Sequence, residues 1–290
     1  MQVSTKEIAL KFGLELVGPD KIVFGFSVPE NQQDNTVLWT KQLSIFSEIF
    51  TGVLVAPKEF KGKEKDHVTY LYCDKSPRLI FARILNTFFQ HLIYDDLKNN
   101  VEYYRQDPNV RIADNCFIAE NVKIGEGTII YPNTTIFSGT IIGRNCQINA
   151  NCSISTIGLG FEYDGDEIVK FPQLGGVIIG DDVEIGPNST IRRGALGNTI
   201  IKNGCKIGSL SNIGHNTEIG EQCILTTQCV VGGSSILGNK VFMGINAITR
   251  NKIRIGNNVN IGMGSVITKD IPDNVVVYGN PAKVIRTNEP

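Results

Sequence analysis

Residues 112–154 read IADNCF IAENVK IGEGTI IYPNTT IFSGTI IGRNCQ INANCS I, so an isoleucine opens every hexad. A period of six is neither the 3.6 of a helix nor the two of a flat strand. It is typical of a solenoid in which each hexad forms one short side of a coil. The same phase resumes at Ile179, Ile185, Ile191, Ile201, Ile207, Ile213, Ile219, Leu225, Val231, Leu237 and Met243, misses at Thr249, and closes at Ile255, Ile261 and Ile267. The sequence therefore predicts a mainly β fold, with a parallel β-helix over residues 108–271.

The other positions of the hexad support this interpretation. Glycine often follows the aliphatic residue, and asparagine is frequent near the predicted corners, where left-handed backbone is tolerated. The fifth position is small or β-branched, as the crowded interior beside the aliphatic stack requires. Six cysteines occupy this position, and we expect them to be small buried residues rather than metal ligands or disulfides: Cys116, Cys146, Cys152, Cys205, Cys223 and Cys229.

Length and charge restrict the class of protein. The chain has 290 residues and a formal net charge of −1, with no dense basic stretch. Nucleic acid is therefore not an expected partner. No apolar run approaches the roughly 18 residues that span a bilayer, and residues 1–10 lack the pattern of a signal peptide. We expect a cytoplasmic protein without a transmembrane segment.

Residues 1–107 lack the repeat and predict a small α/β domain. Ser4 and Glu7 resemble a capping pair for a helix ending at Phe12. Residues 53–56 predict a buried strand, and residues 78–91 predict an amphipathic helix with proline in its first turn. The remaining segments are a C-terminal tail, 272–290, and an insert, 156–176, that interrupts the solenoid. A loop of this length leaving a rigid repeat is more often functional than idle.

His215 is the candidate catalytic residue, because it is the one solenoid histidine among three in the chain. It takes the third position of its hexad. If three hexads make a coil, it stacks between Gly233 and Gly197, with open space on the outer surface. Such a site suits a general base, although a lone surface histidine is usually without function.

Several motifs resemble the UDP-3-O-acylglucosamine N-acyltransferase family of lipid A biosynthesis. They are KFPQLG at 170–175, RGAL at 193–196 and IGHN at 213–216, and the resemblance extends into residues 9–18 and 76–85. It implies a left-handed β-helix, a homotrimer with active sites between subunits, and an N-terminal domain that helps to bind the nucleotide. It also implies that His215 is the general base and that the Gly233 N–H is an oxyanion donor. The expected substrate-binding residues are Phe161, Tyr163, Lys170, Gln173, Ser209 and Asn216.

Departures from the family pattern suggest a different substrate. Arg192 replaces the usual Asp before RGAL, and Ser209 stands where the family has Asn. The segment GNPAKVI at 279–285 resembles the ending of sugar acyltransferases that use coenzyme A, and only nine residues follow Pro281. We therefore expect an N-acyltransferase that moves a short acyl group from acyl-CoA to a nucleotide-linked amino sugar in surface polysaccharide or lipopolysaccharide biosynthesis. The alternative is the lipid A reaction with hydroxyacyl-acyl carrier protein.

Three other classes remain as weaker alternatives. A zinc-dependent carbonic anhydrase on this solenoid needs about three histidines at each metal, so we expect no metal. A bifunctional nucleotidyltransferase needs a glycine-rich phosphate loop, which the first 107 residues lack. A non-catalytic β-helix scaffold would not require the KFPQLG and IGHN motifs.

Overall fold

The computed structural model describes residues 2–92 and 97–288, which divide into two compact units. Unit 1 comprises Met1–Tyr94 together with Gly160–Gln173, and unit 2 comprises Asp95–Leu159 together with Leu174–Pro290. This division differs from the one expected from the repeat, which placed the boundary at residue 107 and the whole insert in the solenoid. Most of the insert groups with the N-terminal unit because it packs on a helix of that unit.

Unit 1 is a small α/β domain, as the sequence predicts. Its main sheet has the order β2-β7-β6-β5-β4, in which β4 to β7 run parallel and β2 pairs antiparallel with β7. Helix α1 is capped as expected, since the Glu7 N–H donates to Ser4 Oγ at 3.1 Å. The elements are β1 (Val3–Ser4), α1 (Thr5–Phe12), β2 (Glu15–Val17), β3 (Ile22–Val23), β4 (Gly25–Phe26), β5 (Thr36–Trp39), α2 (Leu43–Glu48), β6 (Gly52–Pro57), a 3₁₀ turn (Lys58–Phe60), β7 (Val68–Cys73), α3 (Pro77–Phe88) and a second 3₁₀ turn (Gln90–Leu92).

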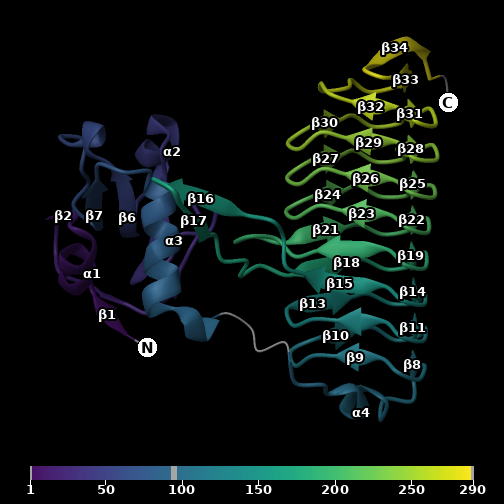
Figure 1. Cartoon of the computed structure of the whole chain (residues 1–290), viewed down its shortest axis with the longest axis horizontal. Helices are drawn as coiled ribbons and strands as arrows, with labels where there is room; N and C mark the ends of the chain where they lie inside the picture. Colours follow the sequence, from purple (N-terminus) through teal and green to yellow (C-terminus); the bar gives the residue numbers. More distant parts are fainter. Residues whose placement is uncertain (1, 93–96, 289–290) are drawn as a thin grey trace. The chain divides into compact units, whose positions relative to one another are not determined.

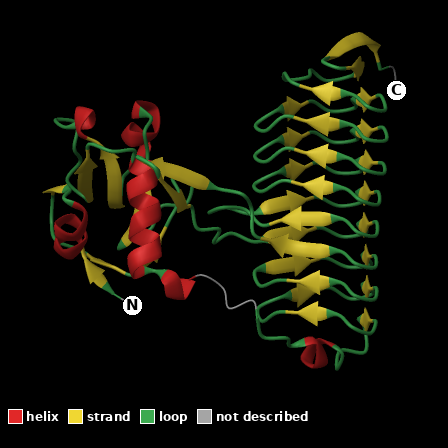
Figure 2. Cartoon of the chain, viewed as in Figure 1, coloured by secondary structure: helices red, strands yellow, loops and turns green. Residues whose placement is uncertain are grey.

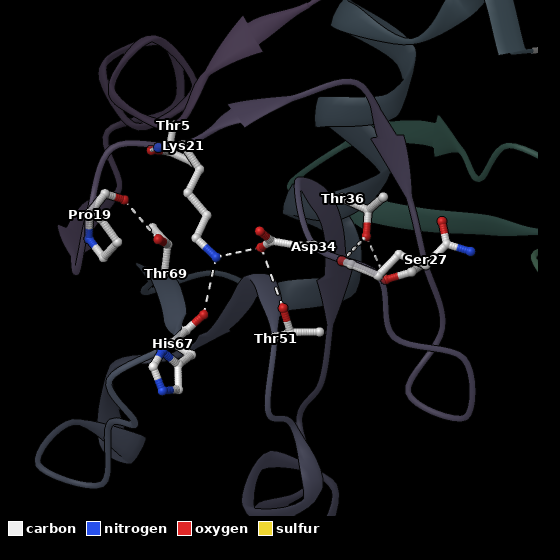
Figure 3. A network of polar contacts seen from close by, with 10 residues as sticks. Thr5, Pro19, Lys21, Ser27, Asp34, Thr36, Thr51, His67 and Thr69 are labelled. Atoms are coloured by element: carbon white, nitrogen blue, oxygen red, sulfur yellow. Dashed lines mark hydrogen bonds and ion pairs between the residues drawn. The ribbon is translucent and has the colours of Figure 1, made fainter.

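An ion pair ties together the segments that precede the parallel strands of unit 1 (Figure 3). Lys21 Nζ donates to Asp34 Oδ1 at 2.6 Å and to the His67 carbonyl at 3.1 Å. Thr51 Oγ1 also donates to Asp34 Oδ1, at 3.4 Å. The hydrogen bond from Lys21 lowers the pKa of Asp34. Because these residues precede β5, β6 and β7, the amino ends of the strands are occupied by this network.

The insert forms a two-stranded antiparallel hairpin, β16 (Phe161–Asp164) and β17 (Glu167–Lys170), beside α3 (Figure 1). Arg78 pairs with Glu162, and Arg83 pairs with Asp164 at 2.8 Å. A hydrogen bond from Lys75 is the largest of the contributions that lower the pKa of Asp164. The acidic turn of the insert is thus anchored by the basic residues on and before α3.

An aromatic contact completes this attachment. The ring of Phe171 stacks on Phe81 at 6.1 Å between centroids, and the Arg78 guanidinium lies 4.2 Å from the Phe171 centroid. Phe171 is 2% exposed, whereas Tyr163 on the outer face of the hairpin is 75% exposed. The hairpin therefore has one face buried in unit 1 and one face in solvent.

We predict that Phe171→Ala destabilises unit 1, because truncating a buried phenylalanine costs about 3–5 kcal/mol. Hydrogen exchange should show lost protection of amides in β5, β6 and β7, with the solenoid amides unchanged. Tyr163→Ala, on the exposed face of the same hairpin, is the matched control and should leave protection as it was. Equal effects of the two variants would show that the hairpin is not attached through Phe171.

Unit 2 is a parallel β-helix whose described strands form three sheets (Figures 1 and 2). The β8 sheet contains β8 (Arg111–Ile112), β11 (Ile129–Ile130), β14 (Gln147–Ile148), β19 (Glu184–Ile185), β22 (Lys206–Ile207), β25 (Ile224–Leu225), β28 (Phe242–Met243), β31 (Asn260–Ile261), β33 (Val275–Gly279) and β34 (Ala282–Thr287). The β9 sheet contains β9 (Phe117–Ile118), β12 (Thr135–Ile136), β15 (Ser153–Thr156), β20 (Thr190–Arg192), β23 (Asn212–Ile213), β26 (Val230–Val231), β29 (Ile248–Thr249) and β32 (Val266–Ile267). The β10 sheet contains β10 (Lys123–Ile124), β13 (Thr140–Ile142), β18 (Val177–Ile179), β21 (Thr199–Ile201), β24 (Glu218–Ile219), β27 (Ile236–Leu237) and β30 (Arg254–Ile255).

Three hexads make one coil, as predicted. Ile112 pairs with Ile130, and Ile118 pairs with Ile136, eighteen residues apart in each case. The aliphatic residues of the first hexad position and the six solenoid cysteines lie in the interior, and the cysteines are free and buried. Asparagines with positive φ turn many of the corners. The prediction of small buried cysteines is therefore confirmed.

The two ends of the solenoid extend beyond the range that the repeat predicts. At the start, helix α4 (Val101–Tyr104) contributes Val101 to the solenoid core. At the end, β33 continues the β8 sheet beyond β31, and β34 pairs antiparallel with β33. Residues 272–288 thus cap the solenoid with a hairpin. The hexad count misses both segments because neither carries the period of six.

Candidate active site

His215 follows β23 at the corner between the β9 and β10 sheets, which we call the β9–β10 corner. Ile213 pairs with Val231, so the register places Gly233 beside His215 on the next coil. A Cβ added to Gly233 would lie 2.8 Å from His215 Nε2. The half-buried imidazole therefore lies against the Gly233 backbone, in the space that a side chain would occupy.

The other expected neighbour, Gly197, is not in register with His215. Ile191 pairs with Ile213, a step of twenty-two residues, so Arg193 is the counterpart of His215 on the preceding coil. The break after Arg193 lengthens this coil, which is why stacking by eighteen residues fails here. Gly197 instead lies near Asn216, whose Nδ2 donates to the Gly197 carbonyl at 3.4 Å.

Asn216 holds the imidazole and the lengthened corner together. Its Oδ1 accepts from the Ala195 N–H at 2.8 Å and lies 3.1 Å from His215 Nδ1. Since a backbone N–H can only donate, the Asn216 atom facing Ala195 is the amide oxygen. An amide oxygen can only accept, so Nδ1 of a neutral His215 carries the proton and Nε2 keeps its lone pair. Asn216, expected to bind substrate, is placed by this geometry to position the base.

Gly233 is buried beside the His215 ring, and its backbone N–H forms no sheet hydrogen bond. Neither the sheet register nor any side chain in the described part of the chain supplies it with an acceptor. Because the imidazole lies on the same glycine, a proton acceptor and a backbone hydrogen-bond donor are adjacent at this corner. This pair can serve attack on a carbonyl, in which one group removes a proton and the other stabilises an oxyanion.

Ser209 lies at a different corner, between the β8 and β9 sheets. It lines a pocket of about 350 Å³, together with Asn149, Glu184, Gly186, Pro187, Lys206, Ile207, Gly208, Ile224, Leu225, Thr226 and Thr227. Within one chain Ser209 is not beside His215. The two residues do share a coil, because β22 and β23 are consecutive sides of it.

The expected residues of the insert belong to unit 1, whereas His215, Gly233, Asn216 and Ser209 belong to unit 2. Phe161, Tyr163 and Lys170 are exposed on the outer face of the hairpin. Gln173 is 6% exposed, and its Nε2 donates to the Phe171 carbonyl at 3.3 Å, while Oε1 has no partner among the described atoms. None of these four residues belongs to the same unit as His215.

Arg193 is a feature that the sequence reasoning missed. It is 1% exposed, and its guanidinium donates to the carbonyls of Ser155 at 2.8 Å and Ser138 at 3.2 Å. These carbonyls lie on coils that precede His215, next to the root of the insert. The ten-residue step after Ile191 was the available signal, because a lengthened corner leaves room for a long side chain to enter.

Neither a metal-binding cluster nor a membrane-spanning helix is found in the described ranges 2–92 and 97–288. No group of three His, Cys, Asp or Glu side chains is arranged to hold a metal ion there. None of the helices in those ranges has the length and apolarity required to span a bilayer.

Comparison with known proteins identifies a family model and several relatives. The model of the bacterial transferase hexapeptide (six repeats) matches residues 121–156. A UDP-3-O-acylglucosamine N-acyltransferase from Methylobacterium nodulans is 40% identical over 129 residues, which cover 44% of this chain and 37% of that protein. One from Dechloromonas aromatica is 51% identical over 72 residues, covering 25% and 21%.

Solved structures agree on the fold. LpxA from Acinetobacter baumannii is 26% identical with a TM-score of 0.53, covering 63% of this chain and 71% of that one. A UDP-N-acetylglucosamine acyltransferase from Campylobacter jejuni is 21% identical with a TM-score of 0.53, covering 62% and 74%.

The aligned part spans 37% of the length of the first of these relatives. The motifs KFPQLG and IGHN resemble this family. The alignment with its members covers less than half of the chain. The chain carries bacterial transferase hexapeptide repeats folded as a left-handed parallel β-helix, and over 44% of its length it is similar to a UDP-3-O-acylglucosamine N-acyltransferase.

Proposed function

We propose that the protein transfers an acyl group from a phosphopantetheine thioester to the amino group of a UDP-linked amino sugar, with UDP-3-O-acylglucosamine as the favoured acceptor. The observation that carries this proposal is the His215 imidazole resting on Gly233, with Asn216 on its Nδ1 side. The names of the aligned relatives support an amino group as acceptor. They favour the lipid A acceptor over the other amino sugars expected from the sequence.

The chemistry follows from the placement of these groups. The sugar amine attacks the thioester carbonyl carbon as His215 Nε2 takes a proton from the nitrogen, which is worth on the order of 10²–10⁴ in rate. The Gly233 N–H stabilises the oxyanion that forms, worth roughly 3 kcal/mol. The C–S bond then breaks, the thiolate leaves, and the imidazolium returns the proton to sulfur. No covalent enzyme intermediate is required.

The donor is the second part of the proposal. The tail at 279–285 predicts acyl-CoA, and the lipid A alternative predicts hydroxyacyl-acyl carrier protein. Both donors present a thioester on a phosphopantetheine arm, so the mechanism at His215 is the same for both. Unit 1 would hold the nucleotide, at the carboxyl ends of its parallel strands, where ligands of open α/β sheets bind.

A substrate matrix tests this function. Acetyl-CoA, a longer acyl-CoA and hydroxyacyl-acyl carrier protein are each combined with UDP-3-O-acylglucosamine, UDP-glucosamine and a dTDP-linked amino sugar, and thiol release is followed with product mass. We expect turnover with a nucleotide-linked amine as acceptor. Absence of thiol release in every combination would contradict the proposal.

We also expect the protein to be a homotrimer whose axis runs along the solenoid. Such symmetry keeps each coil at the same height. It would therefore bring the Ser209 pocket of one copy level with His215 of the next, since both lie on one coil. Exposed apolar residues beside the pocket support the trimer, because the interface between copies would bury them: Leu210, Ile224, Phe242, Ile245 and Met263.

Sedimentation velocity at micromolar concentration should show a single species of three chains. An active monomer would contradict both the trimer and an active site shared between copies. Leu210→Asp with Ile245→Asp should dissociate the trimer and lower turnover together, because two charges would enter the interface. Full activity of that dissociated variant would likewise contradict the shared site.

A further inference from the structure

The lengthened corner, which comprises residues 194–198, is hydrogen-bonded to the segment where the insert re-enters unit 2. This segment, residues 174–176, is called the return limb. The Gly194 N–H donates to the Gly176 carbonyl at 3.1 Å. The Gly176 N–H in turn donates to the side-chain oxygen of Asn198 at 2.8 Å. The return limb is therefore bonded to both ends of the lengthened corner.

Glycines let these two segments pack backbone against backbone. A Cβ added to Gly175 of the return limb would overlap the carbonyl oxygen of Gly197, and so would a Cβ added to Gly194. The Leu174 N–H also donates to the Ala195 carbonyl at 2.6 Å. Close-packed groups transmit displacements to their neighbours. A shift of the return limb therefore moves the lengthened corner with it.

The lengthened corner is in turn bonded to the residue that holds the base. The Ala195 N–H donates to Asn216 Oδ1 at 2.8 Å, and this oxygen lies 3.1 Å from His215 Nδ1. Thr199, which follows the corner and is 0% exposed, accepts a hydrogen bond from the Asn216 N–H at Oγ1, at 2.9 Å. The Thr199 N–H donates to the Gly176 carbonyl at 3.1 Å. Hydrogen bonds thus run without a break from the return limb to the imidazole.

We propose that the return limb sets the tautomer of His215 through the lengthened corner, and that Asn198 and Thr199 are positioning residues for the base. This inference rests on the proposed function. While the Ala195 N–H is in place, Asn216 can present only its amide oxygen to Nδ1, so Nε2 keeps its lone pair. When the corner moves away, the Asn216 amide can rotate and present its NH₂ group instead. Nε2 then carries the proton and cannot accept one from the sugar amine.

Asn198→Ala removes the acceptor of the Gly176 N–H at an exposed position, so the fold should be retained. We expect kcat to fall about three- to tenfold, the factor that one hydrogen bond contributes. The KM values of both substrates should stay as they were, because the imidazole acts in the transition state. Asn198→Asp should restore turnover, since a carboxylate oxygen accepts the same hydrogen bond.

The matched control is Asn203→Ala, at the corner between the β10 and β8 sheets. The Asn203 side-chain oxygen accepts from the Asp181 N–H at 2.9 Å, and this bond spans 22 residues, as the bond from Gly176 to Asn198 does. Both asparagines are exposed. Asn203→Ala should leave kcat unchanged. Equal losses in the two alanine variants would overturn the proposal, because any loosened corner would then have the same effect.

Nitrogen NMR of histidine-labelled protein reads the tautomer without turnover, at alkaline pH where a histidine ring is neutral. The His215 signals are assigned as those missing from His215→Ala. In the wild type the proton should be on Nδ1. Asn198→Ala should move part of the population to Nε2, and so should Thr199→Val, which removes the hydroxyl that accepts from Asn216. Thr199→Ser keeps that hydroxyl and should retain the wild-type spectrum.

The two measurements separate this inference from the proposed function. A proton on Nε2 in the wild type would overturn the inference, and so would an unchanged tautomer in both Asn198→Ala and Thr199→Val. If the tautomer responds as expected but no acceptor is acylated, the proposed function alone is wrong. If His215→Ala abolishes turnover while Asn198→Ala and Thr199→Val keep the wild-type kcat, the role of the return limb alone is wrong.

Discussion

His215→Ala is expected to lower kcat by about 10²–10⁴, the contribution of a positioned general base. The loss should fall on kcat and kcat/KM alike, because the imidazole acts in the transition state rather than in binding the sugar. The side chain lies half-buried at a corner, so the fold should be retained. Thiol release under saturating substrates measures this effect.

His67→Ala is the control, since His67 is an exposed histidine of unit 1. It should leave turnover unchanged. If His215→Ala kept turnover close to the wild-type value, the base would have to be another group. Thermal unfolding of both variants should match the wild type, which separates loss of the base from loss of structure.

Gly233→Ala is expected to reduce kcat almost as far as removing the imidazole. The added Cβ would lie 2.8 Å from His215 Nε2, closer than real Cβ contacts, so the ring must leave its place. The backbone itself accepts alanine, because Gly233 does not have a positive φ. The expected result is therefore a folded protein with a displaced base and a kcat lowered by roughly 10² or more.

Gly197→Ala is the matched glycine control, because its added Cβ meets only Asn216 Nδ2, at 3.8 Å. It should be close to wild type. In the His215→Ala background, Gly233→Ala should cause no further loss, since no ring remains to be displaced. A Gly233→Ala enzyme with normal turnover would contradict the position of the imidazole.

The period of six was sufficient to predict the solenoid, because the first position of the hexad lies in the interior and is aliphatic almost throughout, with Thr249 as the exception. It also predicted that His215 and Gly233 would stack, since they lie eighteen residues apart on unbroken coils. The acyltransferase resemblance rested on short motifs, and the 40% identity to a named acyltransferase over 129 residues is consistent with it.

The failures occur where the period breaks. The step from Ile191 to Ile201 changes the stacking by four residues, so Arg193 rather than Gly197 is the counterpart of His215. The sequence assigns the insert to the solenoid, because residues 156–176 interrupt the hexad repeat. Its attachment to α3 depends on pairs such as Arg83 with Asp164, which are eighty-one residues apart and carry no local signal.

The most direct test of the central claim compares UDP-3-O-acylglucosamine with its analogue that has a hydroxyl in place of the 2-amine. Each is incubated with the donor that supports thiol release, and the linkage in the product is determined by mass and by base-catalysed hydrolysis. We predict an amide with the amine, little or no ester with the hydroxyl analogue, and no product with His215→Ala. Equal acylation of both acceptors, or amide formation by His215→Ala at the wild-type rate, would contradict amine acylation by this histidine.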